Sequence, residues 1–335
     1  MVSDLRALEG LLSEPTAAAR EVLGEVDGDI VVLGAGGKMG PTLAMMLRKA
    51  APERTIYAVS RFSDREAKGR IEEAGAETIT VDLLDESLYG RLPDVPNVFY
   101  LAGMKFGATG KQPLTWAMNV FLPGLVARHY KDARIVALST GNVYPFTAPD
   151  GGGSREEDAP GPVGEYAQSC LGRERIFEHF SLLHGTAVTL IRLNYANEPR
   201  YGIIVDLTQK ILEGRAIDVT MGAVNVIWQG DANNTIIAAL RLTASPAAIL
   251  NVTGPETIGV RELAGRIGKV LGKEPTFVGQ EAETALLSNA SRSFEAFGRP
   301  AVSLDEMIEK IVTWVAGGKA VLGKPTKFDV RDGKF

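Results

Sequence analysis

A glycine-rich turn between an apolar run and a helical pattern constrains this chain more than any other feature. Residues 29–40 read Asp-Ile-Val-Val-Leu-Gly-Ala-Gly-Gly-Lys-Met-Gly, and a helix-compatible run follows. The pattern predicts a buried strand, a tight turn and a helix N-terminus. Such a turn lets a pyrophosphate approach bare backbone N–H groups at the positive end of the helix. The turn therefore predicts a dinucleotide site, and a purely structural strand-to-helix turn is the alternative.

The three spaced glycines have different expected roles. Gly34 permits the turn, Gly37 allows close approach of the phosphates, and Gly40 lets the helix pack on the strand. The expected cofactor contacts at the turn are Gly34, Gly36, Gly37, Lys38, Met39 and Gly40.

Apolar runs alternate with helical patterns along most of the chain. Several of the runs are nearly continuously apolar, which is typical of parallel strands covered on both faces. The alternation predicts an α/β fold, a doubly wound parallel sheet (Rossmann) with a smaller C-terminal substrate lobe. We expect strands at 29–33, 55–59, 77–81, 97–102, 134–139 and 187–193, and helices at 38–50, 64–74, 85–91, 113–130 and 165–184.

Four parts of the chain can be separated on this pattern. An N-terminal extension, 1–28, is expected to form one or two helices with Ser3 and Ser13 as caps. The nucleotide-binding domain follows at 29–193, and 194–317 forms mainly the substrate lobe, interleaved with the sheet domain. In that lobe we expect helices at 201–213, 230–244, 260–271 and 303–316, with short strands at 216–220 and 248–252. The polar tail, 318–335, is expected to be solvated, or alternatively an extended arm.

Composition excludes several classes of protein. Apolar residues make up 45% of the chain, yet no run approaches the roughly 18 residues of a membrane span. A net charge of −5 without a basic stripe argues against nucleic acid as a partner. The single cysteine excludes an internal disulfide and a multi-cysteine zinc site. We therefore expect a cytoplasmic protein that binds small molecules, with no metal and no signal peptide.

Motifs beyond the glycine turn resemble those of one family. Asp82-Leu83 follows the third expected strand, Phe99-Tyr-Leu-Ala-Gly103 forms the fourth, and Asn119 lies in a long helical stretch. Ser139-Thr140 ends the fifth strand, and Arg192-Leu-Asn194 ends the sixth. With Tyr166 and the glycine turn, these motifs resemble the extended short-chain dehydrogenase/reductases, also called the NAD-dependent epimerase/dehydratase family.

The resemblance implies roles for individual residues. Tyr166 would be the catalytic acid or base, and Thr140 the catalytic hydroxyl. Substrates would be sugars, nucleotide sugars or similar polyols, and the chain would form a homodimer through the helices at 113–130 and 165–184. The further cofactor contacts that it implies are Asp82, Leu83, Leu101, Ala102, Gly103, Asn119 and Asn194.

One departure from the family pattern concerns the catalytic pair. The family keeps Tyr-x-x-x-Lys, whereas this chain has Tyr166-Ala-Gln-Ser-Cys170. Residues four apart share a helix face, so the two side chains should lie together. A free phenol has a pKa of about 10, and a cysteine supplies no cation to lower it. Proton abstraction by Tyr166 should therefore be impaired, whereas proton donation during carbonyl reduction should suffer less.

Another cation could replace the missing lysine. Lys105 follows the fourth strand, where it either supplies this charge or is a solvated loop lysine. Arg173 and Arg175 follow on the same helix, and we expect both to point away from the site. Cys170 itself occupies one of the family's catalytic positions, although we expect it to be an inert buried thiol.

The end of the second strand bears on the choice of cofactor. Ser60 and Arg61 occupy the position where NAD-binding sites usually have an acidic residue, and arginine accommodates a 2′-phosphate. NADP(H) is therefore favoured, with NAD(H) as the alternative. The sequence thus predicts an NAD(P)-dependent oxidoreductase, epimerase or dehydratase of a sugar-like carbonyl or alcohol, with impaired catalysis. The alternative is a nucleotide-binding regulatory protein with a degenerate active site.

Overall fold

A seven-stranded parallel sheet forms the centre of the molecule. The computed structural model describes residues 4–105 and 110–334. Every neighbouring pair of strands in the sheet is parallel, and the chain crosses from one half of the sheet to the other between β3 and β4. This arrangement confirms the doubly wound sheet that the sequence predicts. The strand order is β11 (Ala248–Val252), β6 (Ala187–Leu193), β5 (Arg134–Thr140), β4 (Asn97–Tyr100), β1 (Ile30–Leu33), β2 (Ile56–Ser60) and β3 (Glu77–Thr80).

Like the helix expected at 230–244, which covers a face of the sheet, the strand at 248–252 lies elsewhere than expected. It was expected in the substrate lobe, but it joins the main sheet as β11 and pairs with β6, with Leu250 opposite Ile191. Its apolar residues are compatible with either place, and only the tertiary path brings it to the sheet edge.

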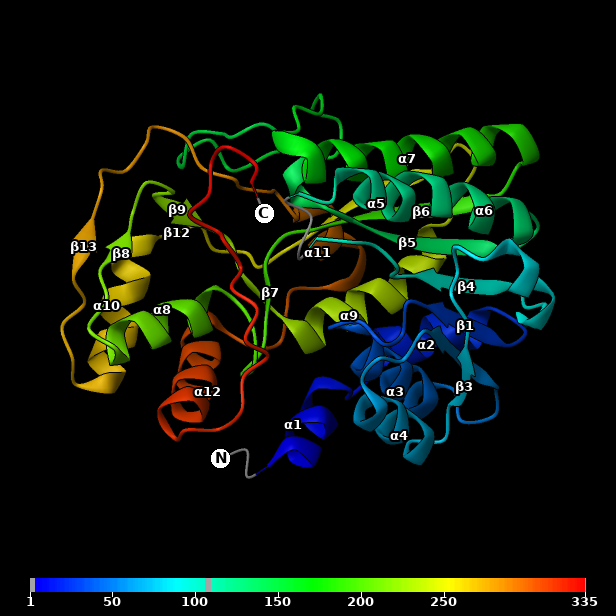
Figure 1. Ribbon diagram of the computed structural model, residues 1–335, viewed down its shortest axis with the longest axis horizontal. Coiled ribbons are helices and arrows are strands. Elements are labelled where there is room, and N and C mark those ends of the chain that lie inside the picture. The colour runs from blue at the N-terminus through cyan, green and yellow to red at the C-terminus, as the bar shows by residue number, and fades with distance from the viewer. Residues whose placement is uncertain (1–3, 106–109, 335) are drawn as a thin grey trace.

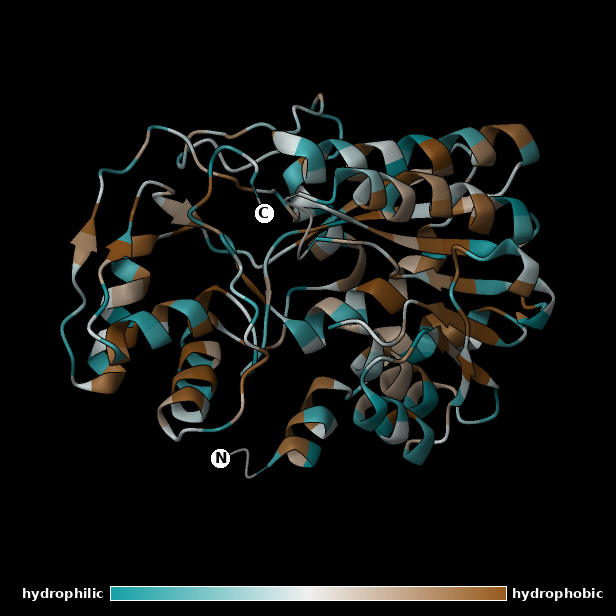
Figure 2. Ribbon diagram, viewed as in Figure 1, coloured by the Kyte–Doolittle hydropathy of each residue, from teal (hydrophilic) through white to brown (hydrophobic). Residues whose placement is uncertain are grey.

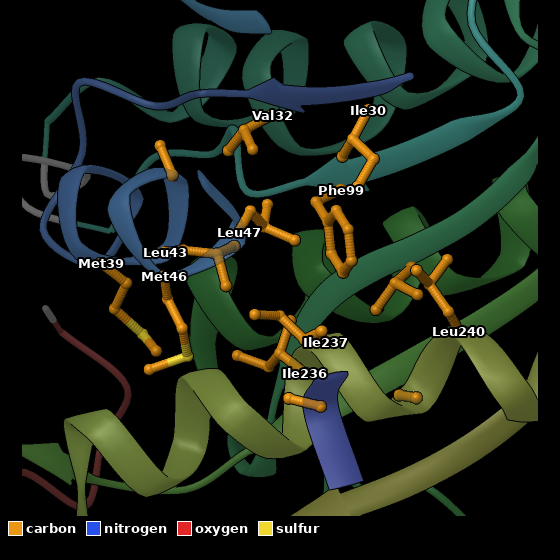
Figure 3. Packing of buried hydrophobic residues seen from close by; sticks show 14 of the residues in the cluster. Ile30, Val32, Met39, Leu43, Met46, Leu47, Phe99, Ile236, Ile237 and Leu240 are labelled. Carbon is orange, nitrogen blue, oxygen red and sulfur yellow. The ribbon is translucent and has the colours of Figure 1, made fainter. Parts of the chain in front are cut away.

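Helices cover both faces of the sheet (Figure 1). Figure 3 shows the packing on one face, where Ile30, Val32 and Phe99 of the sheet meet Leu47 and Ile237 of the helices. Burial of this apolar surface is the main source of stability, at about 25 cal/mol per Å². This face carries α2 (Ala17–Glu25), α3 (Gly40–Ala50), α4 (Arg65–Glu73), α9 (Gln229–Ala238) and η4 (Ala239–Leu242), and the other carries η1 (Glu86–Arg91), α5 (Gln112–Trp116), η2 (Ala117–Phe121), α6 (Leu122–His129) and α7 (Gly164–His184).

The remaining elements, except a short helix at Ser291–Phe297 that packs against β11 and α9, build a smaller lobe with its own apolar core. Brown ribbon segments in Figure 2 mark apolar residues both in the sheet and along the lobe helices. The helix α11 (Ser291–Phe297) was not expected from the sequence. The lobe elements are α8 (Ile203–Leu212), α10 (Val260–Leu271) and α12 (Leu304–Ala316), with the strand pairs β7 (Ala196–Asn197) and β10 (Ile227–Trp228), β8 (Ile217–Asp218) and β13 (Phe277–Val278), and β9 (Ala223–Val224) and β12 (Ile258–Gly259).

Two helices form the N-terminal extension, with caps other than those expected. The side chain of Asp4 caps α1 (Leu5–Leu12), and that of Thr16 caps α2. Ser13 instead follows the end of α1 and donates to the Glu9 carbonyl at 2.6 Å, while Ser3 lies outside the described residues. The buried side chains of α1 join the lobe core, whereas those of α2 join the sheet core, so the extension links the two parts.

The polar tail is docked rather than solvated. In Figure 1 it runs from α12 between the lobe and the sheet domain toward the start of α7. Phe328 is only 2% exposed and belongs to the lobe core. The backbone N–H and hydroxyl of Thr326 donate to the Asp206 carboxylate, at 2.8 and 2.5 Å. Of the two expectations, the extended arm is therefore the correct one, because one aromatic anchor and specific hydrogen bonds hold the tail.

None of the described helices is both long enough and apolar enough to cross a bilayer.

Candidate functional site

A cleft of about 510 Å³ opens at the carboxyl ends of the strands, between the glycine turn and the lobe. This is the crevice in which open α/β sheets bind ligands. Of the residues that the sequence singled out, the cleft is lined by Gly34, Gly37, Lys38, Met39, Gly40, Arg61, Leu101, Gly103, Lys105, Thr140, Tyr166 and Asn194. The others, which do not line it, are Gly36, Ser60, Asp82, Leu83, Ala102, Asn119 and Cys170.

The glycine turn has the geometry that a dinucleotide requires. Gly34 has φ +89°, and a Cβ there would lie 2.6 Å from the backbone nitrogen of Ala102. No described side chain caps the N-terminus of α3, so its N–H groups remain for a ligand. Gly40 packs against the backbone of Ala35 in the turn itself, not against the strand as expected.

The far end of the cleft carries the residues expected to select the cofactor. The Arg61 guanidinium lies 4.0 Å from the Asp82 carboxylate, and both side chains are exposed. The Ser60 hydroxyl would contact a Cβ placed at Gly36, at 2.7 Å. This end of the cleft thus carries an exposed cation, Arg61, beside a carboxylate.

Tyr166, Thr140 and Cys170 meet at the other end. Tyr166 and Cys170 lie on α7, and the Tyr166 hydroxyl is hydrogen-bonded to both Thr140 and Cys170. Burial, and then the neighbouring Cys170, raise the pKa of the Tyr166 phenol well above its ordinary value. Burial also raises the pKa of the Cys170 thiol. At neutral pH both groups are therefore protonated, which suits a proton donor better than a base or a thiolate nucleophile.

Arg173 is the cation that the sequence interpretation missed. It was expected to point away from the site, but it is 6% exposed and lines the cleft. Its Nη1 donates to the Leu138 carbonyl and its Nη2 to Asn119 Oδ1, both at 2.7 Å. Its charge lowers the pKa of the Tyr166 phenol and so opposes the effect of burial.

The helical spacing could have found Arg173. It follows Tyr166 by seven residues, or about two helical turns, and so returns to the same face of the helix. Arg175, by contrast, is 56% exposed and pairs with Glu178, as expected. The Nε atom of Arg173 is buried and has no hydrogen-bond partner among the described residues.

Asn119 supports the site from behind. It lies in η2, a π-helical turn, where its Oδ1 accepts from the Met104 N–H at 2.8 Å. Its Nδ2 donates to the Met104 carbonyl and to Ser169 Oγ, at 3.0 and 2.9 Å. Asn119 thus fixes the loop after β4 to α7 and positions Arg173, without lining the cleft itself.

Two lysines reach the same region from different segments. Lys38 extends from the glycine turn to the lobe, where its Nζ donates to the Ala196 carbonyl at 3.0 Å and lies 3.9 Å from the centre of the Tyr201 ring. The Lys105 Nζ lies 5.8 Å from the centre of the Tyr166 ring. Burial lowers the pKa of Lys38 to about 7 and that of Lys105 to about 8. Lys105 is thus near the reacting end and not a fully solvated loop lysine.

Comparison with known proteins identifies the fold. No family model and no curated protein matches the chain. Among solved structures, UDP-glucuronic acid 4-epimerase from Bacillus cereus matches with a TM-score of 0.74 at 18% identity, over 86% of this chain and 99% of that one. UDP-glucose 4-epimerase from Thermotoga maritima matches at 0.72 and 17% identity, over 87% and 99%. MoeE5, solved with UDP-glucose and NAD, matches at 0.72 and 20% identity, over 87% and 99%.

These similarities place the chain in one class by its architecture. It has the Rossmann-type α/β fold of the nucleotide-sugar epimerases, as the motifs of the sequence predict. The proteins that share this fold include the UDP-glucuronic acid and UDP-glucose 4-epimerases named above.

Proposed function

We propose that this chain is an NAD(P)-dependent enzyme that acts on a sugar-like carbonyl or alcohol, as a reductase, epimerase or dehydratase. One observation carries the proposal. The hydroxyl groups of Tyr166 and Thr140 meet in the cleft that begins at the glycine turn. A hydroxyl pair at the carboxyl edge of a doubly wound sheet is suited to bind a carbonyl oxygen and to transfer a proton.

The residues present fit a dinucleotide. Gly34 and Gly37 keep the turn free of side chains, and α3 begins without a side-chain cap. Arg173 lines the other end of the cleft and brings a positive charge there. When bound, the nicotinamide ring supplies or accepts a hydride.

The protein's own groups favour reduction over oxidation. Thr140 would hold a substrate carbonyl oxygen, and the neutral phenol of Tyr166 would donate the proton to it. Oxidation would need the phenolate, and each unit by which the pKa exceeds the ambient pH costs about 1.4 kcal/mol. Because Arg173 lowers this pKa, we propose that it takes over part of the role of the missing lysine.

The exposed Arg61 favours NADP(H) over NAD(H) in this proposal. Its guanidinium would pair with a 2′-phosphate, a charge-assisted contact that NAD(H) cannot make. Two of the structural relatives named above were solved with NAD, so preference for NAD(H) is the competing outcome.

Titration calorimetry with NADPH, NADP⁺ and NAD⁺ tests the proposal. We expect binding of all three, tighter for the phosphorylated forms, and stabilisation by about 2.7 kcal/mol at 100 times the dissociation constant. Arg173→Met should weaken NADPH binding by about tenfold, because it removes a charged donor from the cleft. The matched control is Arg175→Met, which removes an outward-facing cation from the same helix and should leave the affinity unchanged.

Three results would count against parts of this proposal. Failure of all three dinucleotides to bind the folded protein would overturn it. Equal losses in Arg173→Met and Arg175→Met would remove the role of Arg173. Tight binding without hydride transfer to or from sugar-like ketones and alcohols would instead favour the alternative, a nucleotide-binding regulator. Two observations support that alternative, the cysteine at position 170 and the raised pKa of Tyr166.

We also propose that the chain forms a homodimer through the helices α5–η2–α6 and α7. Large apolar side chains are exposed on these helices, among them Phe121 at 58%. Exposed apolar clusters mark association sites. Phe121→Glu should shift sedimentation from dimer to monomer, whereas Val270→Glu, an exposed site on α10, should not. A monomeric wild-type protein would overturn the proposal.

A further inference from the structure

The cleft that holds Tyr166 is lined by cations and, among the described residues, by no carboxylate. Its lining cations are Lys38, Arg61, Lys105, Arg173 and Lys324. A concave surface with charge of one sign attracts ligands of the opposite sign. Three of these cations, all lysines, come from segments far apart in the sequence, so their convergence is a property of the fold.

The three lysines belong to the part of the cleft near the lobe. Lys38 turns from the glycine turn toward Ala196 and Tyr201 of the lobe. Lys105 lies beside Tyr166, which marks the reacting end. Lys324 enters from the tail, together with Thr326. We call these three side chains the lysine triad.

The tail is anchored on both sides of Lys324. The Leu322 N–H donates to the Arg200 carbonyl at 2.9 Å on one side of it. On the other side Thr326 donates to Asp206, and Phe328 is buried in the lobe core. Lys324 thus stands between two anchored points.

The nearby carboxylates are already engaged outside the lining. Asp206 accepts the hydrogen bonds from Thr326, and Glu198 accepts from Arg200 Nε at 3.0 Å. They lessen the repulsion among the lysines without occupying the cleft. The cofactor does not account for the triad either, because its 2′-phosphate would lie at Arg61 and its pyrophosphate at the backbone of the glycine turn, whereas Lys38 Nζ extends from that turn to the Ala196 carbonyl. An oxidised nicotinamide ring is itself a cation.

We propose that the lysine triad binds an anionic group, a carboxylate or a phosphate, of the sugar-like substrate close to the carbon that reacts. The inference rests on the proposed function for the reaction, but the anion site stands on the geometry of the triad. An anion held there would also offset the repulsion between Lys38 and Lys105, which a neutral sugar would not.

The binding of such an anion should take up protons. The groups around Lys38 are Glu198, Arg200, Tyr201 and Lys105, and those around Lys105 are Cys170, Asp206, Lys327 and Tyr166. Since the pKa of Lys38 is about 7 and that of Lys105 about 8, both lose charge as the pH rises. An anion favours the protonated lysines, so binding should weaken from pH 6.5 to pH 9, by roughly tenfold if Lys105 must be charged and by roughly 80-fold if Lys38 must be charged.

Calorimetry of the full-length protein with three probes tests the inference. D-glucuronate carries a carboxylate, D-glucose 6-phosphate a phosphate, and D-glucose no charge. Each is titrated with and without saturating NADPH. We expect one or both anions to bind at least about tenfold more tightly than glucose, and the tighter one identifies the anionic group. D-glucuronate remains ionised from pH 6.5 to 9, so its pH dependence reports on the protein.

Single substitutions locate the site. Lys105→Met and Lys324→Met should each weaken anion binding by about tenfold, which is the loss of one charge-assisted contact. Lys334→Met removes the same charge from an exposed position on the same tail and should have no effect. Thermal unfolding of each variant establishes that it is folded.

The outcomes separate this inference from the proposed function. Equal affinity for glucose and both anions, or equal losses in Lys334→Met and the two triad variants, overturns the anion site. Dinucleotide binding without anion binding overturns the anion site and leaves the proposed function standing. Anion binding that depends on the triad in a protein that binds no dinucleotide supports the anion site and overturns the proposed function.

Discussion

Gly34→Val is expected to destabilise the protein by about 4 kcal/mol and to abolish dinucleotide binding. The φ of +89° at Gly34 costs a β-branched residue about 1–3 kcal/mol. A Cβ there would also lie 2.6 Å from the Ala102 nitrogen and 2.9 Å from the Leu101 carbonyl carbon, so β1 and the loop after β4 would have to separate. Urea unfolding gives the stability, and calorimetry with NADPH gives the binding.

A second glycine provides the matched control. Gly69 lies inside α4, and a Cβ there would meet no atom within 4 Å. Gly69→Ala should therefore raise the stability by about 0.5–1 kcal/mol, because alanine loses less conformational entropy in a helix. Wild-type stability and cofactor affinity in Gly34→Val would show that the turn does not have this backbone.

Glu174→Leu is expected to cost about 3–5 kcal/mol of stability, because it leaves the charge of Arg192 buried without its partner. The Arg192 side chain is 2% exposed and that of Glu174 is fully buried. Arg192 Nη2 donates to Glu174 Oε2 at 2.8 Å, and Nε donates to Oε1 at 3.1 Å. The Ser139 hydroxyl, next to Thr140, also donates to Glu174, at 2.5 Å. Urea unfolding at pH 7 measures the loss.

Two comparisons establish whether the loss comes from the unpaired charge. The double variant Glu174→Leu/Arg192→Met removes both charges and should regain most of the stability. Glu178→Leu breaks the exposed pair with Arg175 on the same helix, and its effect should stay within about 0.5 kcal/mol. A double variant as unstable as the single one would contradict this account of the buried pair.

The sequence predicts most of the sheet because that information is local. Nearly continuous apolar runs such as 134–139 mark strands buried on both faces, and β5 spans Arg134–Thr140. The positive φ of Gly34 also follows from the spacing of glycines between a strand and a helix. The proximity of Tyr166 and Cys170 follows from their spacing of four on one helix. The strand at 248–252 was predicted for the same reason, but its pairing with β6 was not predicted.

The candidate site was only partly predictable, because its cations depend on contacts between distant segments. Arg173 faces the cleft because Asn119 and the Leu138 carbonyl hold it there, and neither is close to it in sequence. Lys38 extends to the lobe because Ala196 offers it a carbonyl.

The sequence by itself determined the strand-turn-helix unit at the glycines and the order of strands and helices in the sheet domain, and its resemblance to a known family pointed to the hydroxyls of Thr140 and Tyr166. Only the tertiary structure decided the charge around that pair. A polar tail with one buried phenylalanine, Phe328, has no periodicity that distinguishes it from a solvated end. Its docking beside the cleft, which brings Lys324 to the site, depends on a lobe surface that exists only once the chain has folded.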